Sequence, residues 1–449
     1  MSFPRYPTYK DSGVEWLGDV PWHWDVKRLR FVAELNPSKS EVSNFDRDTL
    51  VSFLPMDAIG EDGSLSLDKE KPISKLESGY TYFRDGDVTV AKITPCYENG
   101  KGALMQGLLN GIGFGTTELI VARPKPEEIT SSYLHYLFIS PDFRNLGESH
   151  MYGAGGQKRV PDGFVRNFAT AFPPLPEQTQ IVAFLDRETA KIDELVAEQW
   201  QLMALLKEKR QAVISHTVTR GLNPDAPMKP SGIEWLGDVP AHWRVGKCGF
   251  YISILSGFAF PSIGFSEDET ETKLLRGINV GVSRLKWKET VYWLRLPGDG
   301  LDIYEMQVGD LVIGMDRPLI NEGMRVAKVK QADLPCLLLQ RVASLKTGDQ
   351  LDADYLLGLL SSEMFVAHFS PDTTGVSVPH ISPEQINNFV IPIPPVSEQV
   401  AIVAFVGIES AKFDTLTAEA QRAIDLLQER RTALISAAVT GKIDIRGLS

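Results

Sequence analysis

Two short stretches, PCYENGK and GAGGQKRVP, combine glycine with side chains that can hydrogen-bond nucleic-acid bases. Reading bases in the major groove requires Arg, Lys, Asn and Gln on exposed loops. Glycine lets such a loop approach a backbone closely. The alternative for each side chain is a solvated surface charge. The candidates in and just before these stretches are Lys92, Asn99, Lys101, Gln157, Lys158 and Arg159.

A later part of the chain carries a second set of candidates. Arg284, Lys286 and Lys288 alternate with Leu285 and Trp287. This alternation predicts a strand with one basic and one apolar face. Further candidates lie near a turn: Arg317, Asn321 and Arg325.

The sequence lacks the catalytic motifs that would accompany such a site in an enzyme. The GIGFG run has no following Lys-Ser/Thr and no βαβ setting, so it is not a phosphate loop. Neither PP pair forms the (N/D)PP(Y/F) motif of adenine methyltransferases, and the ETK at 271–273 has no PD partner. The histidines form no HExxH, and Cys96, Cys248 and Cys336 form no CxxC. We therefore expect neither an active site nor a metal site.

Composition sets the remaining limits. The 449 residues carry a formal net charge of −12, which argues mildly against nucleic acid unless a partner supplies positive charge. No apolar run reaches the roughly 18 residues of a membrane span, and the N-terminus does not resemble a signal peptide. We expect a cytoplasmic protein without membrane contact.

Two segments of the chain occur twice. GVEWLGDVPWHW at Gly13 returns as GIEWLGDVPAHW at Gly232, and PPLPEQTQIVAF at Pro173 returns as PPVSEQVAIVAF at Pro394. The repeating unit is about 220 residues long, so two copies fill the chain and predict pseudo-twofold symmetry. His23 and His242 recur with it, and their repetition points to packing or subunit docking. The same roles, structural anchoring or partner docking, are expected of Trp16, Trp24, Trp235 and Trp243.

The second repeated segment predicts a long helix in each copy. Neither Gly nor Pro interrupts Glu177 to Arg220, and apolar residues step by threes and fours or their sums. This pattern predicts a heptad seam and an antiparallel coiled coil; the alternative is two amphipathic helices on separate cores. The expected seam is Ile181, Leu185, Ile192, Leu195, Leu202, Leu206 and Val213, with Ile402, Val406, Phe413, Leu416, Leu427 and Leu434.

The two bodies between the repeats read as α+β. Gly86-Asp87, Pro95 and Gly100 match Gly309-Asp310, Pro318 and Gly323, which indicates a shared fold. The chemistry between these turns differs. Lys92 corresponds to Met315, Lys101 to Met324, and Gln157-Lys158-Arg159 to Val378-Pro379-His380.

Together, WLGDVPxHW, the PPLPEQ helix with IVAFLDRETAKID, GFGTTELIV and GGQKRVP resemble the specificity subunits of type I restriction–modification systems. The resemblance covers nearly the whole chain. It implies two target-recognition domains that each read half of a split site in double-stranded DNA. It also implies a coiled coil that sets the spacing and docks two modification subunits. Those subunits carry S-adenosylmethionine, restriction subunits use ATP and Mg, and the specificity subunit itself has no active site or cofactor.

The expected fold is α+β, with two target-recognition domains in pseudo-twofold arrangement, separated by two long helices that form an antiparallel coiled coil. Two alternatives remain: a DNA-independent coiled-coil adaptor, and the specificity portion of a fused methyltransferase–nuclease, which the missing motifs oppose. The expected segments are a Trp-rich segment at 1–26, recognition domain 1 at 27–172, a helix at 173–222, a linker with the second Trp-rich segment at 223–245, recognition domain 2 at 246–393, and a helix with tail at 394–449.

Overall fold

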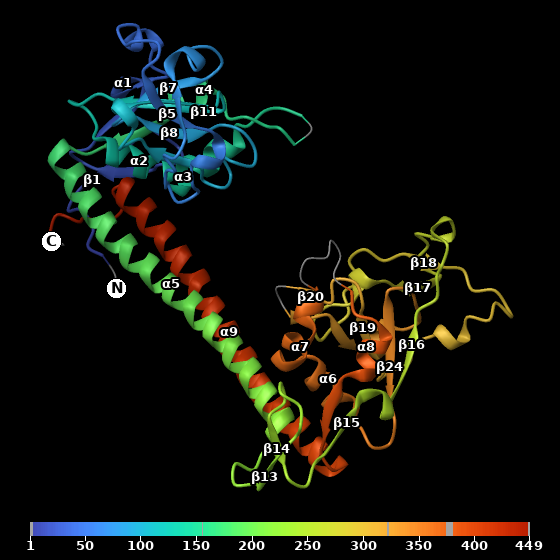
Figure 1. Cartoon of the computed structure of the whole chain (residues 1–449). Helices are drawn as coiled ribbons and strands as arrows, with labels where there is room; N and C mark the ends of the chain where they lie inside the picture. The colour runs from blue at the N-terminus through green and yellow to red at the C-terminus, as the bar shows by residue number, and fades with distance from the viewer. Residues whose placement is uncertain (1–2, 155, 321–322, 374–379, 448–449) are drawn as a thin grey trace. The chain divides into compact units, whose positions relative to one another are not determined.

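The computed structural model describes residues 3–154, 156–320, 323–373 and 380–447 (Figure 1). The chain divides into two compact units. Unit 1 comprises Met1–Gln199 and Gln421–Ser449, and unit 2 comprises Trp200–Ala420.

Unit 1 contains two four-stranded sheets. The first has the order β4-β11-β8-β9 and is antiparallel, and the second has the order β6-β5-β10-β7, with β5 and β10 parallel. The strands are β4 Ala33–Leu35, β5 Leu50–Leu54, β6 Glu70–Pro72, β7 Thr81–Arg84, β8 Val88–Ala91, β9 Gly102–Leu104, β10 Ile112–Gly115 and β11 Leu119–Pro124. Small pairs join β1 Tyr9–Asp11 to β2 Asp19–Pro21, and β3 Asp25–Arg28 to β12 Ala169–Phe172.

Unit 2 repeats this plan. Its first sheet has the order β16-β24-β19-β22, and in its second sheet, β18-β17-β23, the strands β17 and β23 are again parallel. The strands are β16 Ile252–Ser256, β17 Thr272–Leu275, β18 Tyr292–Trp293, β19 Leu311–Gly314, β22 Val326–Lys328, β23 Cys336–Leu338 and β24 Val342–Thr347. The pairs are β13 Met228–Pro230 with β14 Asp238–Pro240, β15 Arg244–Lys247 with β25 Val390–Ile393, and β20 Leu319–Ile320 with β21 Gly323–Met324. The predicted α+β class and shared scaffold are confirmed.

Short capped helices cover the first sheet of each unit. Thr130 and Asp352 accept main-chain N–H bonds at the starts of α2 and α6, so the orphan donors there are satisfied. Helix α2 packs on β8 and β9, and α6 packs on β22. The helices are α1 Leu29–Val32, α2 Ser131–Ile139, α3 Pro141–Ser149, α4 Asp162–Asn167, α6 Ala353–Leu360, α7 Glu363–Thr373 and α8 Pro383–Asn388.

The Gly-Asp pairs that match between the units form the turn before β8 and β19. Gly86 has φ 89° and Gly309 has φ 96°. Residues with a side chain rarely adopt such positive φ values. Asp87 and Asp310 each accept a hydrogen bond from the main-chain N–H three residues earlier. Asp87 also binds the buried Arg123 through two bonds of 2.7 and 2.8 Å. The turn therefore fixes where each of these strands begins.

The repeated segments form helices α5 Leu175–Arg220 and α9 Val396–Val439. In unit 1, Arg431 of α9 binds Asp193 of α5 at 2.9 Å, and in unit 2, Arg210 of α5 binds Asp414 of α9 at 2.6 Å. The start of each helix thus lies beside the end of the other, and the predicted antiparallel coiled coil is confirmed (Figure 1).

Three members of the predicted seam are wrong: Leu195, Leu202 and Leu416 are 44, 42 and 45% exposed. An α-helix drifts by about 20° per heptad from a strict 3.5-residue repeat, so a pattern summed over several turns leaves the interface. Ala420 and Ile424 are buried instead. The buried predicted residues are Ile181, Leu185, Ile192, Leu206, Ile402, Phe413 and Leu434, and the half-buried ones are Val213, Val406 and Leu427.

A Glu-Gln pair in the first turn of each long helix attaches that helix to its unit. The Gln178 side-chain amide donates to the main-chain carbonyls of Glu128 and Pro173, and its oxygen accepts from the N–H of Thr130. Gln399 makes the same three bonds in unit 2. Both side chains are fully buried, so the three bonds are shielded from water.

The glutamate of the pair binds the Trp-rich segment. The Tyr6 hydroxyl and the Trp24 indole N–H donate to Glu177 Oε1 at 2.6 and 3.1 Å, and His23 Nε2 lies 2.7 Å from Oε2. Burial and the bond to Glu177 raise the pKa of Tyr6. The carboxylate also suits the positive end of the helix dipole. The recurring PxHW motif therefore supplies side chains that bind the first-turn glutamate of the long helix.

The matched anchor in unit 2 has fewer bonds. His242 Nε2 lies 2.8 Å from Glu398 Oε2, but the buried Trp243 Nε1 has no hydrogen-bond partner among the described residues. The other repeated tryptophans stack on matched rings, Trp16 on Phe168 and Trp235 on Phe389.

Each helix also ends against a Trp-rich segment. Gly221 and Gly441 follow the helices with φ values of 77° and 71°, as helix-ending glycines do. A Cβ on Gly221 would lie 3.1 Å from the Trp243 ring, and a Cβ on Gly441 would overlap Pro21 and lie 3.2 Å from the Trp24 ring. These close contacts and the positive φ values both favour glycine at the two positions.

The core of unit 1 therefore draws on both ends of the chain. It contains Leu434, Val439 and Ile445 beside Trp24, and the Tyr133 hydroxyl donates to the Val439 carbonyl at 3.2 Å. In unit 2 the corresponding bond, from Tyr355 to the Val218 carbonyl, is 2.7 Å.

We expect Glu177→Leu to destabilise the start of α5 by about 2–4 kcal/mol, because it leaves the buried Tyr6 and Trp24 donors unpaired. The matched Glu398→Leu should cost less than about 1 kcal/mol, because it removes one bond to a half-exposed histidine. Native-state hydrogen exchange at the first turns of α5 and α9 measures both. Equal losses in the two variants would contradict this account of the anchor.

Candidate nucleic-acid interface

In unit 1, the sequence candidates gather at the end of β8. Lys92 directly follows the strand, its N–H donates to the Glu118 carbonyl at 2.8 Å, and its carbonyl accepts from Val160 at the same distance. The Lys92 side chain is half-buried, and its charge helps to lower the pKa of Glu118. The strand end and the chain returning from the α3–α4 loop are thereby held together.

The α3–α4 loop extends away from the sheets of unit 1 (Figure 1). Tyr152 and Arg159 exchange two main-chain hydrogen bonds, of 3.1 and 2.9 Å, that close the loop at its base. Between them, Gln157 and Lys158 are exposed, as is the ring of Tyr152, which the sequence analysis did not select. This loop presents amide, ammonium and aromatic groups to solvent, the groups that contact bases and phosphates.

Arg159 is already engaged by a carboxylate. Its Nε and Nη2 donate to Glu118 Oε2 and Oε1 at 3.0 and 2.8 Å. The bond from Arg159 is the main reason that the pKa of Glu118 is lowered.

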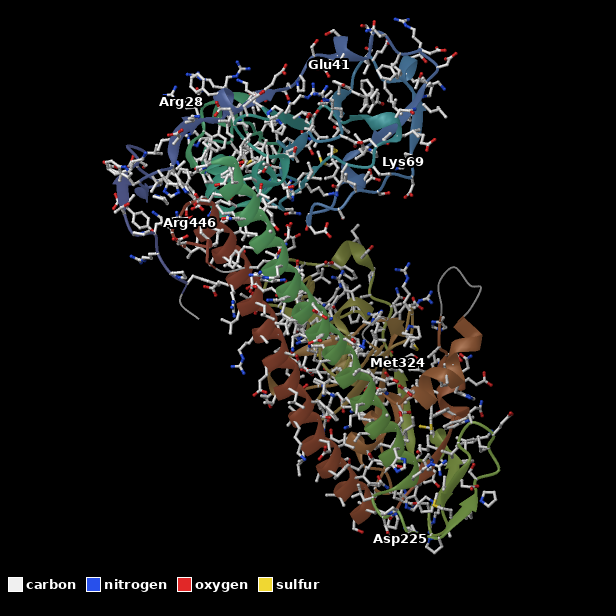
Figure 2. All side chains as sticks on the ribbon, turned by 90° about the vertical axis from the view of Figure 1, so that its left-hand side faces the viewer. Arg28, Glu41, Lys69, Asp225, Met324 and Arg446 are labelled. Carbon is white, nitrogen blue, oxygen red and sulfur yellow. The ribbon has the colours of Figure 1, made fainter. Side chains whose placement is uncertain are left out.

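Asn99 and Lys101 have partners within the protein. The Asn99 amide donates to Glu61 at 2.8 Å on the surface, and the Lys101 ammonium donates to the Met56 carbonyl at 2.9 Å. Lys101 therefore ties the segment before β9 to the loop after β5. The matched residue in unit 2, Met324, which is labelled in Figure 2, is buried.

The predicted strand over 284–288 is wrong. The segment is irregular, and one isolated bridge joins Leu285 to Val280. Its alternation persists, because Leu285 and Trp287 pack on the core while Arg284 and Lys288 are exposed and Lys286 is half-buried. Ser283, with φ 58°, lies directly before this segment.

The remaining candidates of unit 2 differ in exposure. Arg317 is exposed with φ 44°, whereas the Arg325 guanidinium donates to the carbonyls of Val280 and Asp316 at 2.9 and 3.1 Å. Burial lowers the pKa of Arg325. Three residues lie outside the described part of the chain: Asn321, Val378 and Pro379.

Exposed leucines mark the long helices at matched positions. Leu205 of α5 and Leu426 of α9 are 54 and 65% exposed, and Leu195 and Leu416 are exposed in the same way. Six of the predicted seam residues are those for which the sequence predicts either partner docking or a structural role, and they face the protein interior wholly or in part: Leu185, Ile192, Leu206, Val406, Phe413 and Leu427.

The described residues offer no cluster of three His, Cys, Asp or Glu side chains that could hold a metal ion. Among the described helices, none combines the length and apolar character needed to cross a membrane.

Comparisons with known proteins agree with this architecture. The family described as type I restriction modification DNA specificity domain matches residues 23–199. The chain is 32% identical over 465 residues to the EcoAI specificity subunit of Escherichia coli, covering 86% of this chain and 77% of that protein. It is 40% identical over 200 residues to the EcoEI subunit of the same species, covering 44% and 33%. The MjaVIII subunit of Methanocaldococcus jannaschii is 27% identical over 318 residues, covering 70% and 71%.

Two solved structures share the fold. A chain from a study of complex assembly and conformational transition of the type I R-M system has a TM-score of 0.72 at 21% identity, covering 94% of this chain and 98% of that one. HsdS from Thermoanaerobacter tengcongensis has a TM-score of 0.53 at 21% identity over the same shares.

Fold and relatives define a DNA-recognition protein with two matched modules on a shared coiled coil. The chain belongs to the specificity subunits of type I restriction–modification systems. The alternative of a DNA-independent adaptor has no support among these relatives.

We expect Lys158→Ala to weaken binding of the specific DNA site by about 1–3 kcal/mol if the exposed ammonium contacts a base edge. Lys101→Met, which introduces the residue of the matched position in unit 2, should leave DNA affinity unchanged because its ammonium already binds a carbonyl. DNA titration of the chain in complex with modification subunits measures both. A greater loss for Lys101→Met than for Lys158→Ala would contradict this assignment.

Proposed function

We propose that each unit of this chain reads one half of a bipartite DNA site, and that the coiled coil sets the spacing between the halves and docks two modification subunits. The observation that carries this proposal is the matched pair of scaffolds with unlike side chains at corresponding positions. The first sheets of the two units repeat in strand order, while Lys92 and Lys101 in one unit correspond to Met315 and Met324 in the other.

The recognition domains in this proposal are 27–172 and 246–393. In the first, the contacts to DNA come from the loop tip, with Gln157 and Lys158, and from Lys92 beside it. In the second, the exposed cations among the sequence candidates are Arg284, Lys288 and Arg317. We assign no direct DNA contact to Asn99, Lys101 and Arg325, because their side chains bond within the protein. Lys286 is half-buried and has a lesser share.

The chemistry then lies in the partner subunits. We propose that this chain is non-catalytic and cytoplasmic and holds no cofactor. Modification subunits supply S-adenosylmethionine, and restriction subunits use ATP and Mg. The relatives' names as specificity subunits support this division. The net charge of −12 supports it too, because a partner that adds cationic groups would complete the phosphate contacts.

Two modification subunits should bind each chain, because Leu205 and Leu426 offer near-equivalent apolar positions. We expect Leu205→Asp or Leu426→Asp to leave one bound subunit, and the double variant to leave none, because burying an unpaired carboxylate is costly. Native mass spectrometry of co-expressed complexes counts the subunits. Gln201→Asp, at an exposed polar position, is the control. One subunit per wild-type chain under saturating partner would contradict the symmetric arrangement.

The spacing role can be tested by lengthening the helices. Four residues inserted after Glu198 and four after Glu419 add about 6 Å to each helix, which is nearly one turn and lets the seam re-form. Both sites are exposed and lie beside the boundary between the units. We expect unchanged half-site sequences and a spacer wider by about one or two base pairs, at about 3.4 Å each.

Methylome sequencing of a strain carrying the double insertion reads the result. Full activity with an unchanged spacer would exclude a role of the coiled coil in setting the spacing. Altered bases in either half-site would show that recognition depends on the helices.

A further inference from the structure

The base of the α3–α4 loop in unit 1 has a main-chain frame that recurs in unit 2. In unit 1, Lys92 bonds Glu118 on one side and Val160 on the other. Glu118 directly precedes β11, so these bonds hold the end of the loop against the first sheet of unit 1.

The frame of unit 2 uses the corresponding atoms. Met315 directly follows β19, its N–H donates to the carbonyl of Arg341, and its carbonyl accepts from Ile381, both at 2.9 Å. Arg341 directly precedes β24, as Glu118 precedes β11. Isolated bridges join Ile93 to Arg159 in unit 1 and Asp316 to His380 in unit 2 at the same place.

The side chains on this common frame carry opposite charge. In unit 1, an acid before β11, Glu118, binds Arg159 on the returning chain at two points. In unit 2 an arginine, Arg341, stands before β24, and the acid is Asp316. Asp316 Oδ1 lies 2.7 Å from His380 Nδ1 and 3.3 Å from Arg341 Nη1. Unit 1 therefore closes this frame onto the returning chain with an ion pair, and unit 2 closes it with a contact between Asp316 and His380.

We propose that the Glu118–Arg159 pair is a clasp that positions the α3–α4 loop, so that Arg159 is a positioning residue and not a base contact. The proposal rests on the proposed function, in which the α3–α4 loop reads the first half-site. With Nε and Nη2 bound to Glu118, the guanidinium cannot offer the same two donors to a guanine. The clasp also balances the Glu118 carboxylate, which unpaired would repel a phosphate close to the loop.

The clasp is a local device. Side chains of Glu118 and Arg159 are 25 and 38% exposed, so the pair contributes little to the stability of the whole unit. Its effect lies in the loop, because Arg159 also forms the main-chain pair with Tyr152 that closes the base. This closed base holds the part of the loop that carries Gln157 and Lys158.

A charge swap distinguishes positioning from contact. We expect Glu118→Arg alone and Arg159→Glu alone each to slow methylation of the specific site by about tenfold, and the double swap to restore the rate to within about threefold, as coupled pairs do. Arginine at the matched position of unit 2 shows that the frame accepts it. The assay uses the full chain with its modification subunits and substrates that vary one half-site at a time.

The outcomes are decisive. Losses confined to the first half-site and rescued by the swap support the clasp. No loss in the single variants overturns the clasp. An unrescued double variant, with a shallower salt dependence of binding, also overturns it and makes Arg159 a direct contact. If Lys158→Ala leaves first-half-site specificity unchanged, the proposed function of the loop has failed, independently of the clasp.

Discussion

The attachment of each long helix at its first turn is the constraint on which the rest of the structure depends. Glu177 and Gln178 extend from the same turn, and one binds the Trp-rich segment while the other binds the loop before α2. Because both groups are buried, their polar atoms must be paired for the unit to close. A body of either unit can therefore change its exposed loops freely, provided that these bonds are kept.

The repeated residues explain why the Trp-rich segments and the long helices were predictable from sequence. Trp24, Trp243, Gln178 and Gln399 are buried and make specific contacts, so the same residues are needed wherever the same packing occurs. The helices followed from long apolar periodicity without Gly or Pro. Their exact seam did not, because the interface drifts around a helix and Leu195 and Leu416 turn outward.

The interface was less predictable, because the role of a cation depends on neighbours that are distant in sequence. Lys101 and Arg325 look like DNA contacts in the sequence, yet they bind carbonyls of Met56 and Val280. Arg159 finds its partner 41 residues away. The segment at 284–288 alternates as a strand would, but without a neighbouring strand it has no ladder to join.

The composition of unit 1 has a consequence for protein synthesis. Unit 2 is one continuous stretch, Trp200–Ala420, whereas unit 1 needs Gln421–Ser449 in addition to the first part of the chain. Leu434, Val439 and Ile445 belong to its core, so that core stays open while the ribosome makes the whole of unit 2. Unit 1 therefore begins to be made before unit 2 but is completed after it, and part of its apolar surface stays uncovered until the segment after Ala420 has been made.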